Sequence, residues 1–202
     1  MESQITIDDL KKIDAGINEK YAKVATSPEG QFKYPTGSKG LEALNYDKAL
    51  TEKLPKEVAS SFCGVGNPFS LGKIYPGEKI LDIGCGAGVD TILAAIIVGS
   101  KGSVVGVDIV PEMIARAESN LQMIDRDNVN FKKTSGENLP FADDTFDVVI
   151  SNGVINLIPD KEAAMSEIIR VLKPAGRLMV ADQVAASSVQ KDIKTRLANW
   201  FR

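Results

Sequence analysis

A junction of strand, glycine loop and helix at residues 79–98 constrains the fold more than any other feature of this sequence. The apolar run at 79–83 is typical of a buried parallel strand, and it leads directly into loop 84–88, in which every second residue is glycine. Glycine permits backbone angles closed to other residues and lets the backbone approach a ligand closely. A helical pattern at 89–98 follows at once, so the free N–H groups of its first turn attract negative charge. The junction predicts an α/β fold with a ligand-binding turn.

Strand and helix patterns alternate through the second part of the chain. Pro111 suits a helix start and Asp160 suits an N-cap, so both favour the helical assignment of the segments that follow them. The alternation predicts right-handed crossovers and a doubly wound, mostly parallel sheet with helices on both faces. Besides 79–83, the expected strands are 104–107, 129–131, 146–150 and 178–180, and the expected helices are 89–98, 111–124 and 161–172.

Residues 1–70 form an N-terminal extension of a different character, followed by the sheet-forming domain at 71–202. We expect helices at 7–24 and 47–62, the second interrupted at Pro55, with a turn-rich loop at 34–40 between them. The extension is either a lid over the ligand or additional packing on the sheet.

Composition narrows the class of function. A chain of 202 residues with a formal charge of −3 is one domain without the basic patch of a nucleic-acid or membrane-surface binder. The acidic N-terminus lacks the pattern of an export signal, and the longest apolar run, 92–98, is far shorter than the roughly 20 residues of a membrane span. Two cysteines and no histidine predict neither a disulfide framework nor a metal site. We expect a cytoplasmic protein that acts on small molecules.

Asp108 at the end of the second expected strand is the strongest candidate for ligand recognition. It follows Gly84 by 24 residues (108 − 84), where a carboxylate can accept both hydroxyls of a ribose held over the glycine loop. Dinucleotide-binding loops place their last glycine three residues after the middle one, whereas Gly88 follows Gly86 by two. A nicotinamide-dependent oxidoreductase is therefore the second hypothesis.

Over residues 76–182 the chain resembles the Rossmann-like class of S-adenosylmethionine-dependent methyltransferases. Four segments carry the resemblance: Ile-Leu-Asp-Ile-Gly-Cys-Gly-Ala-Gly at 80–88, Val-Gly-Val-Asp at 105–108, the stretch 138–149, and Val-Leu-Lys-Pro-Ala-Gly-Arg-Leu at 171–178. The resemblance implies S-adenosylmethionine as cofactor and methyl transfer to a small-molecule acceptor. A non-catalytic module that binds the cofactor without turnover is a further alternative.

The resemblance also implies where the cofactor binds. The methionine moiety would lie over Asp82 and the glycine loop, the ribose on Asp108, and the adenine between Ile109 and the backbone at 136–137. Ser135 stands where many relatives carry an acid, and its hydroxyl makes a weaker bond than a carboxylate. The full set of implied cofactor-binding residues is Tyr34, Asp82, Gly84, Cys85, Gly86, Gly88, Asp108, Ile109, Ser135, Gly136, Glu137 and Asn152.

A closer resemblance, to the arsenite methyltransferase-like branch, rests on segments 66–68 and 150–161. Arsenic-binding members of that branch carry cysteine where this chain has Gly153, and usually another near Val65. Capture of trivalent arsenic takes several converging thiolates. We therefore expect arsenite to be methylated poorly or not at all, and we interpret Cys63 and Cys85 as packed rather than reactive.

No catalytic residue is assigned. A soft nucleophile needs mainly alignment with the transferred methyl group, whereas an oxygen nucleophile needs a base. For such a base only Glu137, Asp182 and Tyr34 are candidates, and all three are weak.

The C-terminus is short, because 20 residues follow Asp182 (202 − 182), where the family fold adds a helix and two strands. Val189, Ile193, Leu197 and Trp200 or Phe201 recur at helical spacing and predict one amphipathic helix. We therefore expect a sheet truncated at the C-terminus, with five strands in the order 3-2-1-4-5. The exposed edge of the fifth strand or the terminal helix should be covered by a second copy, as in a homodimer, or by the N-terminal segment.

Overall fold

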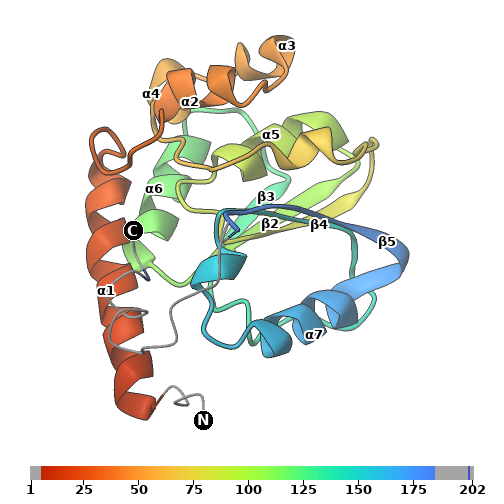
Figure 1. Cartoon of the computed structure of the whole chain (residues 1–202). Helices are drawn as coiled ribbons and strands as arrows, with labels where there is room; N and C mark the ends of the chain where they lie inside the picture. The colour runs from red at the N-terminus through yellow and green to blue at the C-terminus, as the bar shows by residue number, and fades with distance from the viewer. Residues whose placement is uncertain (1–5, 185–199, 201–202) are drawn as a thin grey trace.

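A single parallel sheet organises the protein, and the computed structural model describes it through residues 6–184 and Trp200 (Figure 1). The strand order is β3-β2-β1-β4-β5, as the sequence predicts, and every neighbouring pair is parallel. The strands are β1 Lys79–Ile83, β2 Ser103–Asp108, β3 Val129–Lys133, β4 Phe146–Asn152 and β5 Leu172–Ala181. The helices are α1 Ile7–Thr26, α2 Gly37–Ala43, α3 Lys48–Thr51, α4 Lys56–Ser60, α5 Val89–Val98, α6 Pro111–Leu121 and α7 Lys161–Val171, with short 3-10 turns η1 Pro68–Ser70 and η2 Ile155–Leu157.

The two faces of the sheet carry separate apolar cores. Ile80 faces α5, whose Ala94 and Ala95 pack against it, whereas Leu81 faces α7 and meets Ile168. Successive residues of a strand point to opposite faces, so β1 is buried on both sides. This is why its sequence is almost continuously apolar.

The strand β5 is longer than its apolar run. It begins at Leu172, directly after α7, rather than at 178. Its pairing with β4 is irregular between Phe146 and Val148, and Ala175 adopts a φ of 64° there. The turn residues at 174–176 therefore interrupt the pattern of the strand without ending it.

The helix α1 has a complete set of start signals. The Thr6 hydroxyl accepts a hydrogen bond from the Asp9 N–H, and the Asp9 carboxylate accepts one from the Thr6 N–H, which together form a capping box. Ile13, Ile17 and Val24 are buried at helical spacing and pack with Met113 of α6. The helix α1 is thereby packed alongside α6 (Figure 1).

Segment 27–70 departs from the sequence-based prediction in two respects. The helix expected at 47–62 is two short helices, α3 and α4, on either side of Pro55. Within the loop expected at 34–40, residue 37 begins the helix α2, although glycine disfavours helices. Tertiary packing accounts for α2: the Gly37 N–H donates to the Phe62 carbonyl at 2.7 Å, and a Cβ at Gly40 would lie 3.2 Å from the Phe62 ring, so glycine permits this close approach. Helices α2 and α4 cover the outer face of α5 (Figure 1).

The C-terminal prediction is only partly accessible. The amphipathic helix expected from Val189 onward lies outside the described residues. Trp200 is described, and its indole N–H donates to the Leu157 carbonyl at 2.9 Å. Within residues 6–184, none of the helices combines the length and apolar character needed to cross a bilayer.

Candidate functional site

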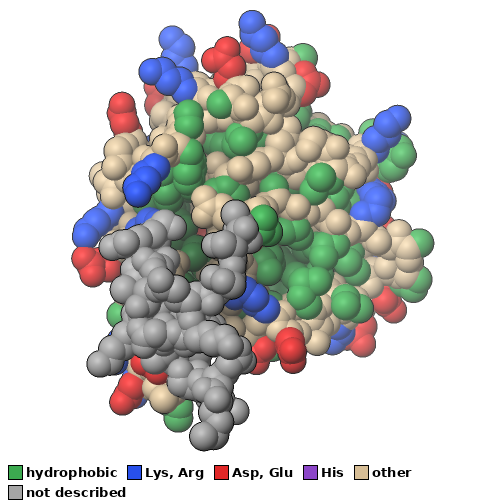
Figure 2. Space-filling model, in the orientation of Figure 1, with side chains coloured by type: hydrophobic (Ala, Val, Ile, Leu, Met, Phe, Trp, Pro, Cys, Tyr) green, Lys and Arg blue, Asp and Glu red, His purple; other side chains and the backbone are tan. Residues whose placement is uncertain are grey.

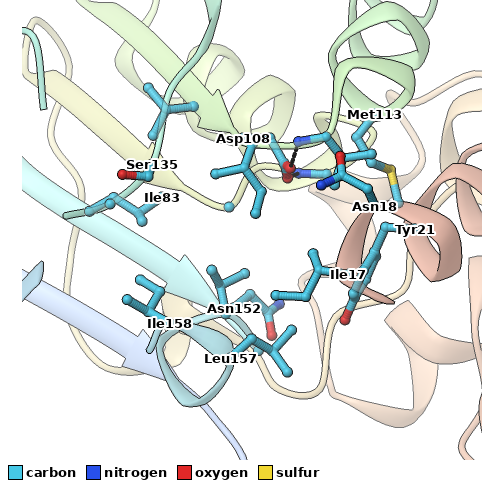
Figure 3. A pocket seen from close by; sticks show the side chains of 18 of the residues that line it. Ile17, Asn18, Tyr21, Ile83, Asp108, Met113, Ser135, Asn152, Leu157 and Ile158 are labelled. Atoms are coloured by element: carbon cyan, nitrogen blue, oxygen red, sulfur yellow. Dashed lines mark hydrogen bonds between the residues drawn. The ribbon is translucent and has the colours of Figure 1, made fainter. Parts of the chain in front are cut away.

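A cavity of about 500 Å³ opens at the carboxyl ends of β1, β2 and β4 (Figure 3). The crossover from β1 leads to β2 on one side of the sheet, and the crossover from β4 leads to β5 on the other side. Ligands of doubly wound sheets bind at such a switch point. Its size falls within the usual range for small-molecule sites. The cavity is lined by nine of the residues proposed from sequence: Tyr34, Gly84, Gly86, Asp108, Ile109, Ser135, Gly136, Glu137 and Asn152.

The glycine loop forms the floor of the cavity. Gly84, Gly86 and Gly88 have φ angles of 69°, 51° and 79°, values that L-residues with side chains rarely adopt. The N–H groups of Gly84 and Cys85 both donate to the Val107 carbonyl, at 2.8 and 2.9 Å, which ties the loop to β2. The alternating glycines are therefore a conformational requirement of this turn.

Asp108 connects the end of β2 to the loop. Its Oδ2 accepts a hydrogen bond from the Gly86 N–H at 2.9 Å, and its Oδ1 accepts one from the Val110 N–H at 2.9 Å (Figure 3). Burial raises the pKa of this carboxyl, and the two backbone N–H groups oppose that shift. Each oxygen retains a lone pair for a ligand hydroxyl. The carboxylate is thus held rigidly at the wall of the cavity.

Two further acids lie beneath the loop. Asp82 is buried and its Oδ2 accepts a hydrogen bond from the Thr91 hydroxyl at 2.6 Å, while burial followed by the charge of Asp90 raises its pKa to about 8. Burial also raises the pKa of Asp90 to about 6. Asp82 and Cys85 line a separate small cavity of about 40 Å³, whereas Gly88 lines neither. The structure therefore places these three residues outside the lining of the main cavity.

Asn152 at the end of β4 joins distant segments. Its Oδ1 accepts hydrogen bonds from the N–H groups of Val65 and Gly66 at 2.9 and 3.0 Å. Its Nδ2 lies within 3.1 Å of the Tyr46 hydroxyl and 2.9 Å of Asp90 Oδ2. These bonds use both ends of the amide, so Asn152 anchors the 63–66 segment at the cavity.

The far end of the cavity, after β3, is formed by backbone and small side chains. Ile109, Ser135 and Gly136 line it, and a Cβ at Gly136 would lie 2.9 Å from Ile158 Cδ1. The Glu137 carboxylate is engaged elsewhere, because its Oε1 accepts a hydrogen bond from the Asp160 N–H at 3.0 Å. This end offers apolar contacts from Ile109 and a serine hydroxyl.

The wall opposite the sheet comes from α1, and none of the site residues predicted from the sequence lies on this helix. Asp14, Ile17, Asn18 and Tyr21 line the cavity, and Figure 3 shows Ile17, Asn18 and Tyr21 beside Asp108 and Asn152. These residues recur at helical spacing, a signal that marks one face of α1. The polar residues Asp14, Asn18 and Tyr21 on that face are the sequence signal from which this wall could have been predicted.

Cys63 and Tyr34 complete this side. The Tyr34 hydroxyl donates to the Cys63 carbonyl at 3.1 Å. Burial, followed by the charge of Asp108, raises the pKa of the Cys63 thiol to about 12. Burial likewise raises the pKa of the phenols of Tyr21 and Tyr34 well above their usual values. The protic groups on this wall are therefore neutral at physiological pH.

Comparisons with known proteins agree with this architecture. A family described as a methyltransferase domain matches residues 74–201. The arsenite methyltransferase of Halobacterium salinarum is 35% identical over 207 residues, a match that covers 96% of this chain and 53% of that protein. A ubiquinone/menaquinone biosynthesis C-methyltransferase of Haemophilus ducreyi is 42% identical over 111 residues, covering 54% of this chain and 42% of that protein.

A solved structure supports the same assignment. An arsenic (III) S-adenosylmethionine methyltransferase from Chlamydomonas reinhardtii superposes with a TM-score of 0.56 and 35% identity, covering 74% of this chain and 50% of that chain. The present chain spans about half the length of the curated relatives it matches. The family match contains the whole sheet and the glycine loop. The resemblance inferred from sequence is thus confirmed: the chain belongs to the methyltransferase-domain family and has the fold of S-adenosylmethionine-dependent enzymes.

Proposed function

We propose that this chain transfers a methyl group from S-adenosylmethionine to a small-molecule acceptor. The observation that carries the proposal is the position of the Asp108 carboxylate. It accepts a hydrogen bond from the Gly86 N–H of the glycine loop and lines a cavity of about 500 Å³. A donor with a ribose needs such an acceptor of hydroxyl hydrogen bonds. The residues present therefore fit the group.

The chain offers a separate surface for each part of the donor. Asp108 would hold the ribose hydroxyls, Ile109 and Gly136 would enclose the adenine, and Gly84 and Gly86 would support the methionine moiety. Ser135 supplies a hydroxyl at the adenine end. Asp82, buried beneath the loop with its pKa raised to about 8, adds no charge at neutral pH and accepts the Thr91 hydroxyl rather than contacting the donor.

The acceptor would occupy the part of the cavity between α1 and the end of β4. Tyr21, Cys63, Val65 and Leu157 line this part, and it is largely apolar. When bound, S-adenosylmethionine supplies a sulfonium whose methyl group an aligned nucleophile can take. The neutral thiol and phenols of this wall would not remove a proton at physiological pH. We therefore propose an uncharged acceptor that brings its own lone pair, and a protein contribution that consists of alignment and exclusion of water.

Arsenite is the acceptor named for several relatives, and we propose that this chain methylates it poorly. Val65 and Gly153 lie side by side, because a Cβ at Gly153 would come within 3.1 Å of Val65 Cγ2. Neither supplies a thiolate, and Cys63 has a raised pKa. Efficient production of methylated arsenic by the purified chain would contradict this proposal.

Calorimetry and a tritiated-methyl assay test the function in two stages. Binding of S-adenosylhomocysteine or S-adenosylmethionine at micromolar to millimolar concentration is the expected first result, and its absence would refute the proposal. Methyl transfer to members of an acceptor panel is the expected second result. Binding without transfer to any acceptor would favour the non-catalytic module, and binding of reduced nicotinamide instead would favour the oxidoreductase.

We further propose that the N-terminal extension is a lid over the cavity. Four side chains of α1 line the wall opposite the sheet, which supports this role. Slower hydrogen exchange throughout α1 on addition of S-adenosylhomocysteine is expected. Unchanged exchange would favour the alternative of structural packing.

The edge of β5 is proposed to pair with a second copy of the chain. Among the described residues β4 is the one strand bonded to β5, and Leu178 and Ile169 are 36% and 67% exposed. Segment 66–73 covers only the face of β5 that carries Met179 and Ala181. Figure 2 shows apolar side chains gathered on the side of the molecule where Figure 1 places β5. A homodimer in analytical ultracentrifugation is expected, and a monomer at 100-fold dilution from about 1 mM would contradict it.

A cytoplasmic location and independence from nucleic acid remain predictions from composition.

A further inference from the structure

Asn120, in the last turn of α6, is a buried amide that the proposed chemistry does not use. Its side chain is 0% exposed. Its Nδ2 donates to the Ala87 carbonyl at 2.9 Å, and Ala87 lies between the last two glycines of the glycine loop. Its Oδ1 is buried without a hydrogen-bond partner among the described residues. The amide nitrogen of Asn120 is therefore hydrogen-bonded, whereas its amide oxygen is not.

The unbonded oxygen makes the amide a poor choice for stability alone. A buried acceptor that loses its water contacts and gains no partner destabilises the folded state. The other buried residues of α6 are the apolar Met113 and Ala117, so an apolar side chain of similar size would suit this face of the helix. The bond to Ala87 is the feature that an apolar residue could not reproduce.

That bond acts on a peptide of the loop that is flanked by glycine. The Ala87–Gly88 peptide is followed by a glycine with φ 79°, and the absence of a Cβ makes rotation of the peptide easy. At one end of the peptide, the Gly88 N–H donates to the Cys85 carbonyl at 2.8 Å. At the other end, Asn120 binds the Ala87 carbonyl. Two hydrogen bonds on opposite sides thus select one orientation.

The orientation of this peptide affects both neighbours. Two residues before Gly88, the Gly86 N–H donates to Asp108 Oδ2. The following residue, Val89, begins α5. Rotation of the Ala87–Gly88 peptide would therefore shift the Gly86–Asp108 contact and the start of the helix together.

We propose that Asn120 is a positioning residue that holds the glycine loop in its ligand-binding conformation, at the expense of an unbonded buried oxygen. This inference rests on the proposed function, in which the loop supports the methyl donor. It assigns to α6 a part in cofactor binding although Asn120 does not line the cavity.

The test compares Asn120→Leu with a matched control, Asn128→Leu. Asn128 also has a buried, unbonded Oδ1, and its Nδ2 donates to the carbonyls of Gly99 and Gly102 at the opposite end of the sheet. For each variant the melting temperature, the affinity for S-adenosylhomocysteine and the hydrogen exchange of the Gly88 amide in the free protein are measured. Asn120→Ala provides the same comparison if Asn120→Leu does not fold.

Asn120→Leu should keep or raise the melting temperature, weaken S-adenosylhomocysteine roughly 3- to 10-fold through loss of one hydrogen bond, and speed exchange at Gly88. Asn128→Leu should lower the melting temperature and leave the other two quantities unchanged. Unaltered affinity and exchange in Asn120→Leu would overturn the inference, as would a fall in melting temperature equal to that of the control. If the parent protein binds no S-adenosylhomocysteine, the proposed function fails, and the exchange of Gly88 still decides whether Asn120 positions the loop.

Discussion

Replacing Asp108 with asparagine tests the proposed ribose site most directly. The two carboxylate oxygens each accept one backbone N–H, from Gly86 and Val110, so each has one lone pair left for a ligand hydroxyl. Hydrogen bonds to a charged group contribute about 1.5–3 kcal/mol each. Asparagine removes one of these acceptors and takes the charge from the other, a combined loss of about 3 kcal/mol, which corresponds to roughly 100-fold in affinity.

The asparagine variant also disturbs the free protein, because its NH₂ group must face one of the two backbone N–H donors. We expect a stability loss of about 1–3 kcal/mol in urea unfolding, together with S-adenosylhomocysteine binding about 100-fold weaker by calorimetry. Asp147→Asn is the matched control: this carboxylate accepts the Lys79 N–H at 2.8 Å at the opposite end of the sheet. Binding by Asp108→Asn within threefold of the parent protein, with intact circular dichroism, would refute the ribose assignment.

Three further outcomes follow from the buried groups of the site. Because burial raises the pKa values of Asp82 and Asp90 to about 8 and about 6, the folded state holds more protons than the unfolded chain, so the free energy of unfolding should fall as pH rises from about 4 to about 8. Urea titrations at pH 5 and 8 measure this, and a slope that Asp82→Asn leaves unchanged would contradict it. With its pKa raised to about 12, the Cys63 thiol, which lies partly exposed at the cavity, should react with a disulfide reagent at pH 8 far more slowly in the native protein than after unfolding; equal rates in the two states would contradict the raised pKa. Gly84→Ala should destabilise the fold by roughly 1–3 kcal/mol because φ is 69° and the new Cβ would strike the Val154 side chain, and Gly84→Ala/Val154→Ala should recover part of this loss in thermal melts.

The second part of the fold could be predicted from the sequence because its signals are local. The expected strand 79–83 and helix 89–98 have the observed bounds, and helix 161–172 is one residue too long. Apolar runs flanked by turn residues encode buried parallel strands without reference to distant contacts. Asp108 and the glycine loop could be placed for the same reason, since both stand at strand ends.

The arrangement of segment 27–70 could not be predicted because it depends on tertiary contacts. The helix α2 begins at Gly37 in a stretch rich in turn residues, and the Gly37 N–H donates to the distant Phe62 carbonyl at 2.7 Å. Likewise, the bonds of Asn152 to Tyr46 and Asp90 join residues 106 and 62 positions apart. The position of Asn152 at the end of a strand is enough to predict that it lies at the cavity. Its role as an anchor depends on these long-range bonds, which the sequence does not reveal.

The charges around the cavity have a consequence for product release. Among the described lining residues, the carboxylates of Asp14, Asp108 and Glu137 outnumber the single ammonium of Lys133. A sulfonium donor carries one positive charge more than the thioether left after transfer, so the acidic surroundings attract the substrate form more strongly than the product form. After methyl transfer, the site would therefore bind the thioether product more weakly than it bound the sulfonium donor. The ratio of the two affinities should shrink as added salt screens these charges.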